Sequence, residues 1–193
     1  GEPRPGSCGL PIPGAIIRIA PLDGSPGSLP PGECGEVCIA GPNVTPGYWK
    51  RPDATAEAMT EDGFLRTGDV GYMDEKGWVY IVDRTKDMIL CSGYNVYPRV
   101  IEEAIYEHPS VEEVAVIGVD DPWRGQSPKA FIKLRSGAPR LSFEELQRFL
   151  EGRLGKHERL SAMELRDALP RTPVGKLSKK DLVEEERARA KAS

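Results

Sequence analysis

Residues 83–99 constrain the fold more than any other stretch, because they separate two kinds of sequence pattern. The stretch combines a charged cluster, a short apolar run at 88–90, the flexible pair Ser92 and Gly93, and Pro98, which can begin a helix. Short strand-like segments with frequent glycine and proline precede it, whereas helix and strand patterns alternate after it. The sequence therefore predicts two folding units that join at a polar hinge.

The composition predicts a folded protein with a sizeable core. The chain has 193 residues, of which 39% are hydrophobic, enough for one large domain or two small ones. Its net charge of -4 argues against nucleic acid as the main partner. No apolar run approaches the roughly 20 residues that a membrane span needs, and no signal peptide opens the chain. We therefore expect a cytoplasmic protein without a membrane span.

The four cysteines and two histidines do not predict a metal site. Their spacing does not match a paired-cysteine zinc site, and the histidines lie far from the cysteines in the sequence. Reduced, buried thiols are the expected state. The cysteines are Cys8, Cys34, Cys38 and Cys91, and the histidines are His108 and His157.

The first half of the chain predicts a small β-rich unit. A hairpin is expected around a turn at 74–77, and Asp53 is expected to cap a short helix that ends near Met59. Many short strands punctuated by glycine and proline favour a small barrel or a curled sheet. The expected strands lie at 15–20 and 36–40 and within the hairpin at 71–82.

The second half predicts a compact α+β unit. Ser142 and Glu145 have the spacing of a capping box at the start of a helix, and Ser178 is expected to cap a last helix that ends near Ala190. An amphipathic helix is expected earlier, with apolar residues on one face. This helix is expected at 98–107, and the strands at 111–119, 129–134 and 163–169. Strands and helices in this order predict the α+β class.

Two polar positions are candidates for ligand binding. Asp69 follows a glycine at the end of an expected strand, where a carboxylate can accept hydrogen bonds from paired hydroxyl groups; ordinary turn chemistry explains the same pattern. Lys176 ends a loop at 170–176 whose two prolines and glycine fix its shape, and a lysine there suits phosphate or carboxylate. The loop does not match a P-loop, and a solvated lysine after a turn is the alternative interpretation.

Three motifs, at 66–69, 83–98 and 170–176, occur in order and together resemble the C-terminal part of the adenylate-forming enzymes. That family comprises acyl-CoA synthetases, peptide-synthetase adenylation domains and beetle luciferases. The resemblance covers essentially the whole chain, and the wording of the second motif is most similar to fatty acyl-CoA synthetases. It implies that residues 1–83 are the β-rich distal part of the AMP-binding N-terminal domain. Residues 84–193 would then be the mobile α+β C-terminal domain that carries the catalytic lysine.

The resemblance also implies a ligase reaction in two steps. A carboxylate attacks the α-phosphate of ATP to give an acyl-adenylate and pyrophosphate, and the thiol of CoA then displaces AMP. By position, Asp69 and Arg84 would bind the ribose of ATP or AMP, and Lys176 would be the catalytic lysine of the first step. Its positive charge would offset two anions that repel each other. Lys86 would be the hinge about which the small domain swings between the steps.

The CoA contacts implied by the resemblance are less complete. The loop at Ser92, Gly93 and Tyr94 would line the pantetheine tunnel. Trp123 would stack on the CoA nucleotide, with a structural tryptophan as the alternative. Residues 157–160 stand where many relatives have a Tyr-Lys-x-Pro run, and the acid within them argues against a phosphate contact there.

The family's phosphate-binding loop, acyl pocket and Mg²⁺-linked motif lie upstream of these motifs, and none occurs in this sequence. We therefore expect a piece of a longer protein that is inactive alone, with Mg²⁺ ligands outside this chain. An adenylating enzyme of an aryl- or amino-acid-activating branch and a stand-alone binding or regulatory module remain the alternatives. The expected partners are fatty acid, ATP and CoA, a second copy paired through the first half, and a lysine acetyltransferase acting on Lys176.

Overall fold

The computed structural model describes residues 3–192, which form two compact units. The first unit ends at Lys86 and the second begins at Asp87, three residues after the boundary expected from the sequence. The first unit is rich in strands and the second mixes strands with helices, so the predicted fold class is confirmed.

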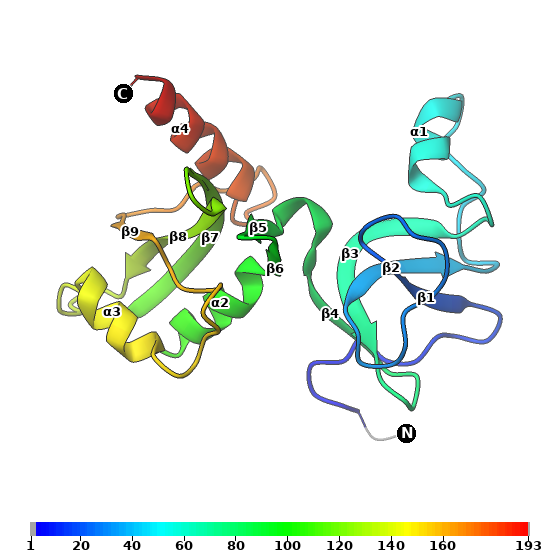
Figure 1. Ribbon diagram of the computed structural model, residues 1–193, viewed down its shortest axis with the longest axis horizontal. Helices are drawn as coiled ribbons and strands as arrows, with labels where there is room; N and C mark the ends of the chain where they lie inside the picture. Colours follow the sequence, from blue (N-terminus) through cyan, green and yellow to red (C-terminus); the bar gives the residue numbers. More distant parts are fainter. Residues whose placement is uncertain (1–2, 193) are drawn as a thin grey trace. The chain divides into compact units, whose positions relative to one another are not determined.

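The first unit is a four-stranded antiparallel sheet in the order β1-β2-β3-β4 (Figure 1). Its strands are β1 (Ile16–Ala20), β2 (Gly35–Ala40), β3 (Leu65–Met73) and β4 (Val79–Arg84). Alternating positions bury Ile19, Val37, Val70 and Val79. Among residues 3–192, β1 and β4 do not pair with each other, so the sheet is open and not a closed barrel.

The short helix α1 (Pro52–Ala58) begins as the sequence predicts but not by the predicted cap. Arg51 occupies the N-cap position without a side-chain hydrogen bond, and Pro52 is the first helical residue, so the prediction that Asp53 caps the helix is wrong. The fixed φ of proline already suits the first turn. Asp53 lies within that turn, where its negative charge favours the helix N-terminus.

The strand β3 is longer than the sequence predicts and includes Asp69 in its middle. The prediction that Asp69 stands at a strand end is therefore wrong. Gly68 has a φ of 72°, and the pairing of β3 with β4 shifts register between Val70 and Gly71. These irregularities interrupt the alternation, so the sequence pattern underestimates the strand.

The second unit contains a five-stranded sheet and three helices, with β6, β5, β8 and β7 in that order and β9 parallel to β8 (Figure 1). A 3-10 turn (Thr85–Asp87) leads into it. Its strands are β5 (Ile89–Cys91), β6 (Tyr94–Val96), β7 (Val111–Asp121), β8 (Gly125–Leu134) and β9 (Ala162–Leu165). Its helices are α2 (Pro98–Tyr106), α3 (Phe143–Leu150) and α4 (Lys179–Ala192).

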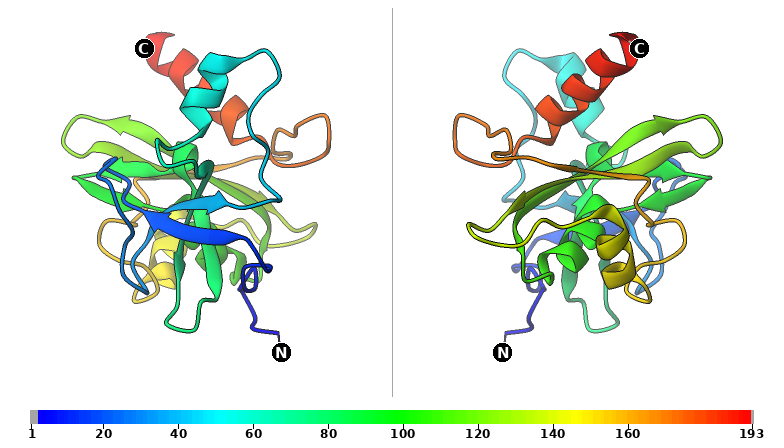
Figure 2. Two further views of the ribbon diagram at one scale, coloured as in Figure 1. Left: turned by 90° about the vertical axis from the view of Figure 1, so that its right-hand side faces the viewer. Right: turned by 90° about the vertical axis from the view of Figure 1, so that its left-hand side faces the viewer.

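The two faces of β7 support two separate cores. Val114 and Val116 face a large core shared with α2 and α3. Ala115 and Ile117 face a smaller core that includes Leu182 of α4. Helices α2 and α3 therefore cover one face of the sheet and α4 covers the other, as Figures 1 and 2 show. This arrangement needs β7 to be apolar on both faces, which explains its continuous hydrophobic run.

Several sequence expectations for the second unit are confirmed, and some strand boundaries differ. The capping box of Ser142 and Glu145 is present, and the Ser178 hydroxyl accepts a bond from the Asp181 amide at 3.4 Å. The strands expected at 111–119 and 129–134 are longer than predicted and leave a turn at 122–124, because β7 and β8 pair as far as Asp121 and Gly125. Strand β9 ends at Leu165, four residues before the expected end.

The four thiols are free, and two of them lie on the surface. Cys38 and Cys91 are buried as expected, whereas Cys8 and Cys34 are exposed, so the expectation of burial is wrong for these two. No group of three or more potential metal ligands occurs among residues 3–192. In the same described part of the chain, no helix is both long and apolar enough to cross a membrane.

Candidate functional site

Asp69 and Arg84 form an ion pair in the first unit. The two residues are direct partners across β3 and β4, and Arg84 Nε donates to Asp69 Oδ1 at 3.2 Å. The Asp69 side chain is 32% exposed, so a ligand can reach its carboxylate. The structure thus brings together the two residues that the sequence assigned to ribose binding.

The backbone around Asp69 is fixed by neighbouring hydroxyl groups. Thr67 Oγ1 donates to the Val37 carbonyl at 2.7 Å and accepts from the Asp69 amide at 3.1 Å. Thr85 Oγ1 donates to the Gly68 carbonyl at 3.1 Å. These bonds hold the left-handed Gly68 and so set the direction in which Asp69 leaves the strand.

Lys86 lies at the boundary between the two units. It is exposed within the 3-10 turn (Thr85–Asp87). Immediately before the turn, the buried Asp83 accepts a hydrogen bond from the Arg84 amide at 2.7 Å. The turn is therefore fixed on its first-unit side, while the Lys86 side chain faces solvent.

Lys176 belongs to a hydrogen-bonded hairpin at residues 170–178, which we call the lysine loop. Its backbone is closed by bonds from the Thr172 amide to the Lys176 carbonyl at 2.7 Å and from the Ser178 amide to the Pro170 carbonyl at 2.8 Å. The Gly175 amide donates to the Thr172 carbonyl at 2.8 Å, with Gly175 at a φ of 82°. The loop thus has a defined shape and presents Lys176 as an exposed cation.

The residues assigned to CoA lie on two turns that touch each other. Ser92 and Gly93 have φ values of 52° and 80°, as a two-residue hairpin between β5 and β6 requires. The Ser92 amide donates to the Arg124 carbonyl at 2.7 Å, which joins this hairpin to the turn at 122–124. Trp123 in that turn is 95% exposed, so it has no structural role in a core.

Asp121 holds the tryptophan turn in place. Its Oδ1 accepts from the amides of Trp123 at 2.9 Å and Arg124 at 3.0 Å, and its Oδ2 accepts from the Ser127 hydroxyl. The hydrogen bond from Ser127, with those from the two amides, lowers the pKa of Asp121 below its ordinary value. The exposed Trp123 ring therefore projects from a fixed backbone.

His157 is a neighbour of this surface that sequence reasoning missed. Its ring stacks on Tyr94, with centroids 3.5 Å apart and an angle of 15° between the planes. Arg124 also reaches this segment, with Nη2 3.5 Å from the Lys156 carbonyl. No sequence signal links two residues so far apart in the chain. Three chain segments thus meet around Tyr94.

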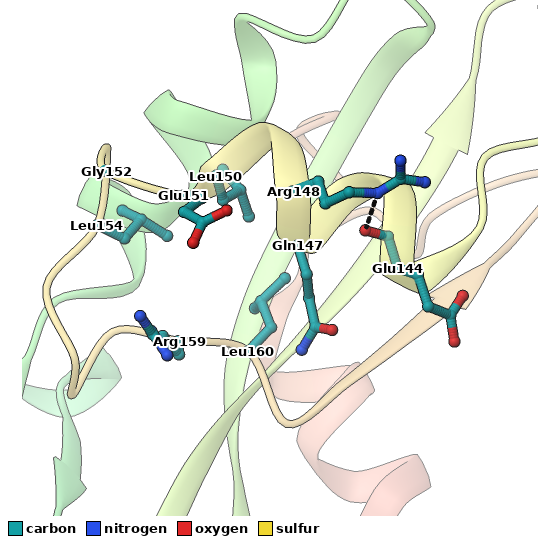
Figure 3. Close-up of a pocket in the computed structure, with 9 residues that line it drawn as sticks. All are labelled: Glu144, Gln147, Arg148, Leu150, Glu151, Gly152, Leu154, Arg159 and Leu160. Carbon is teal, nitrogen blue, oxygen red and sulfur yellow. Dashed lines mark hydrogen bonds between the residues drawn. The ribbon is translucent and has the colours of Figure 1, made fainter.

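A pocket of the second unit is lined by none of the residues described above. It measures about 370 Å³ and lies beneath α3 (Figure 3). Leu150, Leu154 and Leu160 form its apolar part, and Arg148 and Arg159 lie at its edge. Because it contains carboxylates as well as guanidinium groups and none of the predicted site residues, it does not define a candidate site.

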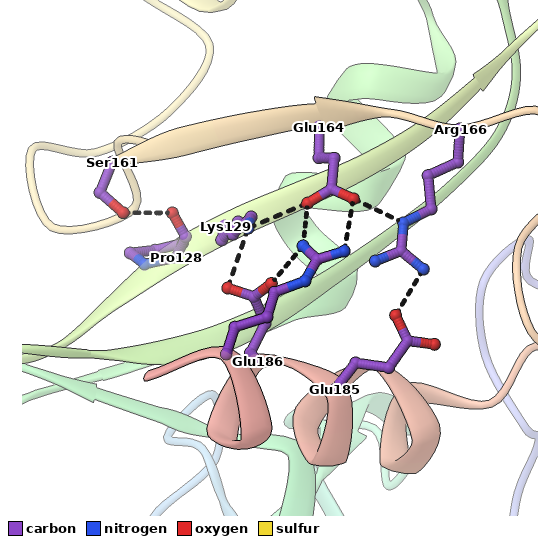
Figure 4. A network of polar contacts seen from close by, with 8 residues as sticks. Pro128, Lys129, Ser161, Glu164, Arg166, Glu185 and Glu186 are labelled. Carbon is purple, nitrogen blue, oxygen red and sulfur yellow. Dashed lines mark hydrogen bonds and ion pairs between the residues drawn. The ribbon is translucent and has the colours of Figure 1, made fainter. Parts of the chain in front are cut away.

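A charged network connects α4 to the sheet (Figure 4). Glu164 of β9 accepts from Lys129 at 3.1 Å and from Arg166 and Arg189 at 2.8 Å each. Lys129 also pairs with Glu186 at 2.8 Å. These contacts fix the helix that follows the lysine loop.

Comparison with known proteins identifies the family to which the chain is similar. Residues 100–176 match the AMP-binding enzyme C-terminal domain, and residues 1–49 match the AMP-binding enzyme family. The long-chain-fatty-acid–CoA ligase of Bacillus subtilis (strain 168) is 46% identical over 187 residues, which cover 96% of this chain and 33% of that protein. A feruloyl-CoA synthase from an Amycolatopsis species is 43% identical over 174 residues, which cover 90% of this chain and 35% of that protein.

A solved structure has the same fold. ATP-bound MatB from Rhodopseudomonas palustris superposes with a TM-score of 0.88 at 36% identity, over 96% of this chain and 36% of that protein. The chain therefore spans about a third of the length of the proteins it matches. The two matched regions, the similar sequences and the shared fold all indicate one family. The chain belongs to the AMP-binding enzyme family, in which it corresponds to the C-terminal portion.

Proposed function

We propose that this chain is the C-terminal part of an ATP-dependent acyl-CoA synthetase. The reaction joins a carboxylic acid, ATP and CoA into acyl-CoA, AMP and pyrophosphate through an acyl-adenylate. The observation that carries the proposal is the lysine loop, a closed hairpin that presents one exposed lysine in the segment matched by the AMP-binding C-terminal domain. Relatives named as long-chain-fatty-acid–CoA ligases favour a fatty acid as substrate.

In the first step, Lys176 stabilises negative charge. A carboxylate and the α-phosphate of ATP repel each other as they approach, and an ammonium group between their oxygens lowers this cost most in the transition state. Lys176 extends from a fixed loop and is exposed to solvent, so its ammonium group is open to contact with these anions. Asp69 accepts hydrogen bonds from the ribose hydroxyl groups, and Arg84 holds the Asp69 carboxylate in place. Lys86, at the unit boundary, is the hinge between the two steps.

In the second step, the surface around Tyr94 receives CoA. The Ser92–Gly93 hairpin has small side chains, which leave room for a narrow pantetheine arm. The exposed Trp123 ring offers a stacking surface for the adenine of CoA. ATP and CoA are therefore the proposed cofactors. Mg²⁺ accompanies ATP, and the residues that bind it lie outside this chain.

A second candidate function is the activation of an aromatic acid. The feruloyl-CoA synthase among the relatives supports it, because its identity of 43% is close to the 46% of the fatty-acid ligase. The acyl pocket decides between the two, and the pocket beneath α3 contains none of the proposed site residues. The amino-acid-activating branch and a stand-alone binding module have no comparable support.

Four further properties belong to the proposal. The chain alone is inactive, because the residues that bind triphosphate and acid lie in the upstream part of the enzyme. The exposed Ile16 on edge strand β1 supports pairing of two copies. The exposed Lys176 supports modification by a lysine acetyltransferase, which would remove the charge used in the first step. A cytoplasmic location suits a ligase that uses ATP and CoA.

The test is a pair of half-reactions in the complete enzyme that carries this chain. We expect Lys176→Ala to reduce acyl-adenylate formation by at least about 100-fold, as the loss of a charge-stabilising group predicts, while CoA attack on supplied acyl-adenylate continues. Lys180→Ala is the matched control, because Lys180 is 83% exposed and has only a 3.7 Å pair with Glu184. Equal loss of both half-reactions in Lys176→Ala would contradict the proposed role.

A further inference from the structure

Arg171 joins the tip of the lysine loop to the sheet. Its Nη1 donates to the Gly175 carbonyl at 2.6 Å, and its Nη2 donates to the carboxylate of Glu113 on β7. Gly175 immediately precedes Lys176. One planar guanidinium group thus fixes the residue before the lysine by two bonds in different directions.

Glu113 lies on the face of β7 that carries α4. No register shift separates Glu113 from Ile117, so by the alternation of a strand Glu113 falls on the same face as Ala115 and Ile117. Its side chain is only 19% exposed, although it is a carboxylate near the end of a strand. Lys133, its direct partner on β8, instead pairs with Glu112 at 2.6 Å. Glu113 therefore pairs with Arg171 from the face that carries α4.

The lysine loop has strong apolar anchors at its two ends but not at its tip. Leu169 and Leu177 pack into the smaller core on either side of the loop. At the tip, Val174 is exposed and Gly175 has the left-handed conformation that glycine adopts most easily. Since apolar burial cannot hold this part, polar bonds fix its position, and Arg171 makes the bond to the Gly175 carbonyl.

From this geometry we infer that Arg171, held by Glu113, is a positioning residue for Lys176 in acyl-adenylate formation. The inference rests on the proposed function of Lys176. Arg171 need not touch a substrate, because its two bonds hold the backbone from which the Lys176 side chain extends. A displacement of about 1 Å at a reacting group can reduce the rate about 100-fold.

The experiment measures both half-reactions in the complete enzyme that carries this chain. We expect Arg171→Gln to reduce kcat for acyl-adenylate formation by about 10-fold to 100-fold, with KM for ATP changed less than about threefold, because the lysine is displaced but not lost. The rate of CoA attack on supplied acyl-adenylate stays within about twofold. Arg171→Lys restores part of the rate, since it keeps the charge beside Glu113 but lacks the fork that also reaches Gly175.

Arg153→Gln is the matched control. Arg153 also pairs with a distant carboxylate, Glu107, and donates to a main-chain carbonyl, that of Phe149, at 3.0 Å. It lies just after α3, on the opposite face of the sheet from α4. We expect Arg153→Gln to leave both half-reactions within about twofold, because it removes the same kinds of bond without touching the lysine loop.

A double variant separates positioning from general stability. If Arg171 acts through Lys176, adding Arg171→Gln to Lys176→Ala does not slow adenylate formation further, since the two effects are not additive. A further 10-fold loss in the double variant, or equal loss of both half-reactions in Arg171→Gln, would overturn the inference. If Lys176→Ala itself leaves adenylate formation intact, the proposed function fails. If only Arg171→Gln leaves it intact, the inference alone fails.

Discussion

Glu164 is the residue whose loss should most clearly show how α4 is held. Its carboxylate accepts from Lys129, Arg166 and Arg189, which come from β8, from the end of β9 and from α4 (Figure 4). Glu164→Gln removes the negative charge but keeps the size and one acceptor oxygen. Each of the three cations keeps another carboxylate partner, so the change does not leave a buried unpaired charge.

The magnitude follows from the pKa of Glu164. Partial burial by itself would raise this pKa, but hydrogen bonds from Arg189, Lys129 and Arg166 outweigh it and lower the pKa from 4.5 to about 2. One pKa unit corresponds to about 1.4 kcal/mol, which gives about 3 kcal/mol of stabilisation. The side chain is 26% exposed, and solvent screening reduces the expected contribution to about 2 kcal/mol.

The sign of the pH dependence is fixed by the direction of the shift. Because folding lowers the pKa of Glu164, its charged form stabilises the folded state fully above the ordinary value of 4.5. The contribution is then lost as the pH falls from 4.5 towards 2. We therefore expect Glu164→Gln to be less stable than the wild type by about 2 kcal/mol at pH 7, with a difference that disappears near pH 2.

The assay is urea unfolding at a series of pH values, followed by circular dichroism at a helix-sensitive wavelength. The helices α2, α3 and α4 all lie in the second unit, so this signal reports mainly on the unit that contains Glu164. Glu103→Gln is the control, because Glu103 forms an exposed pair with Arg99 and should contribute less than about 0.5 kcal/mol. An equal free-energy difference at pH 7 and pH 3 would refute the reasoning, since it could not come from the carboxylate charge.

Three further changes test other parts of the fold. Ser142→Ala should lower the free energy of unfolding by about 1 kcal/mol in urea, because it removes the N-cap of α3; an unchanged midpoint would argue against the cap. Gly71→Ala should cost the first unit about 2 kcal/mol in thermal unfolding, because a Cβ there would stand 2.3 Å from the Tyr80 carbonyl oxygen; unchanged stability would contradict this contact. In a carboxyl NMR titration, Asp62 should have a pKa of about 2, lowered first by the hydrogen bond from Arg18, and Arg18→Gln should raise it; an unshifted titration would contradict the pair.

Features that depend on neighbouring residues were predictable from the sequence. The capping box needs only Ser142 and Glu145, three positions apart, and it is present in the structure. The apolar face of α2, with Ile101 and Ile105 buried, follows equally from helical spacing. The Asp74 turn connects β3 and β4, as turn-forming residues between alternating strands predict. In each case the pattern that predicts the feature involves residues that are near neighbours in the sequence.

Features that depend on distant residues were not predictable in the same way. Arg171 and Glu113 are 58 positions apart, and their contact requires the lysine loop to pack beside β7. The stacking of Tyr94 on His157 requires two loops to meet. The interior position of Asp69 in β3 depends on a register shift that the alternation of residues does not reveal. Tertiary packing decides these arrangements, and single-residue preferences carry no information about them.

The two faces of the second unit's sheet are stabilised by different means, and this difference suits the proposed chemistry. The face towards α2 and α3 buries a large apolar core, whereas α4 contributes Leu182 and the partly buried Val183 to a smaller core and is also held by ion pairs. The lysine loop lies on this second face, between Leu169 and α4. The smaller apolar core on this face reaches Leu169 and Leu177 near the two ends of the loop and leaves Lys176 exposed to solvent. Ionic contacts fix α4, and Arg171 with Glu113 fixes the loop tip, while the lysine stays exposed, which a residue acting on phosphate requires.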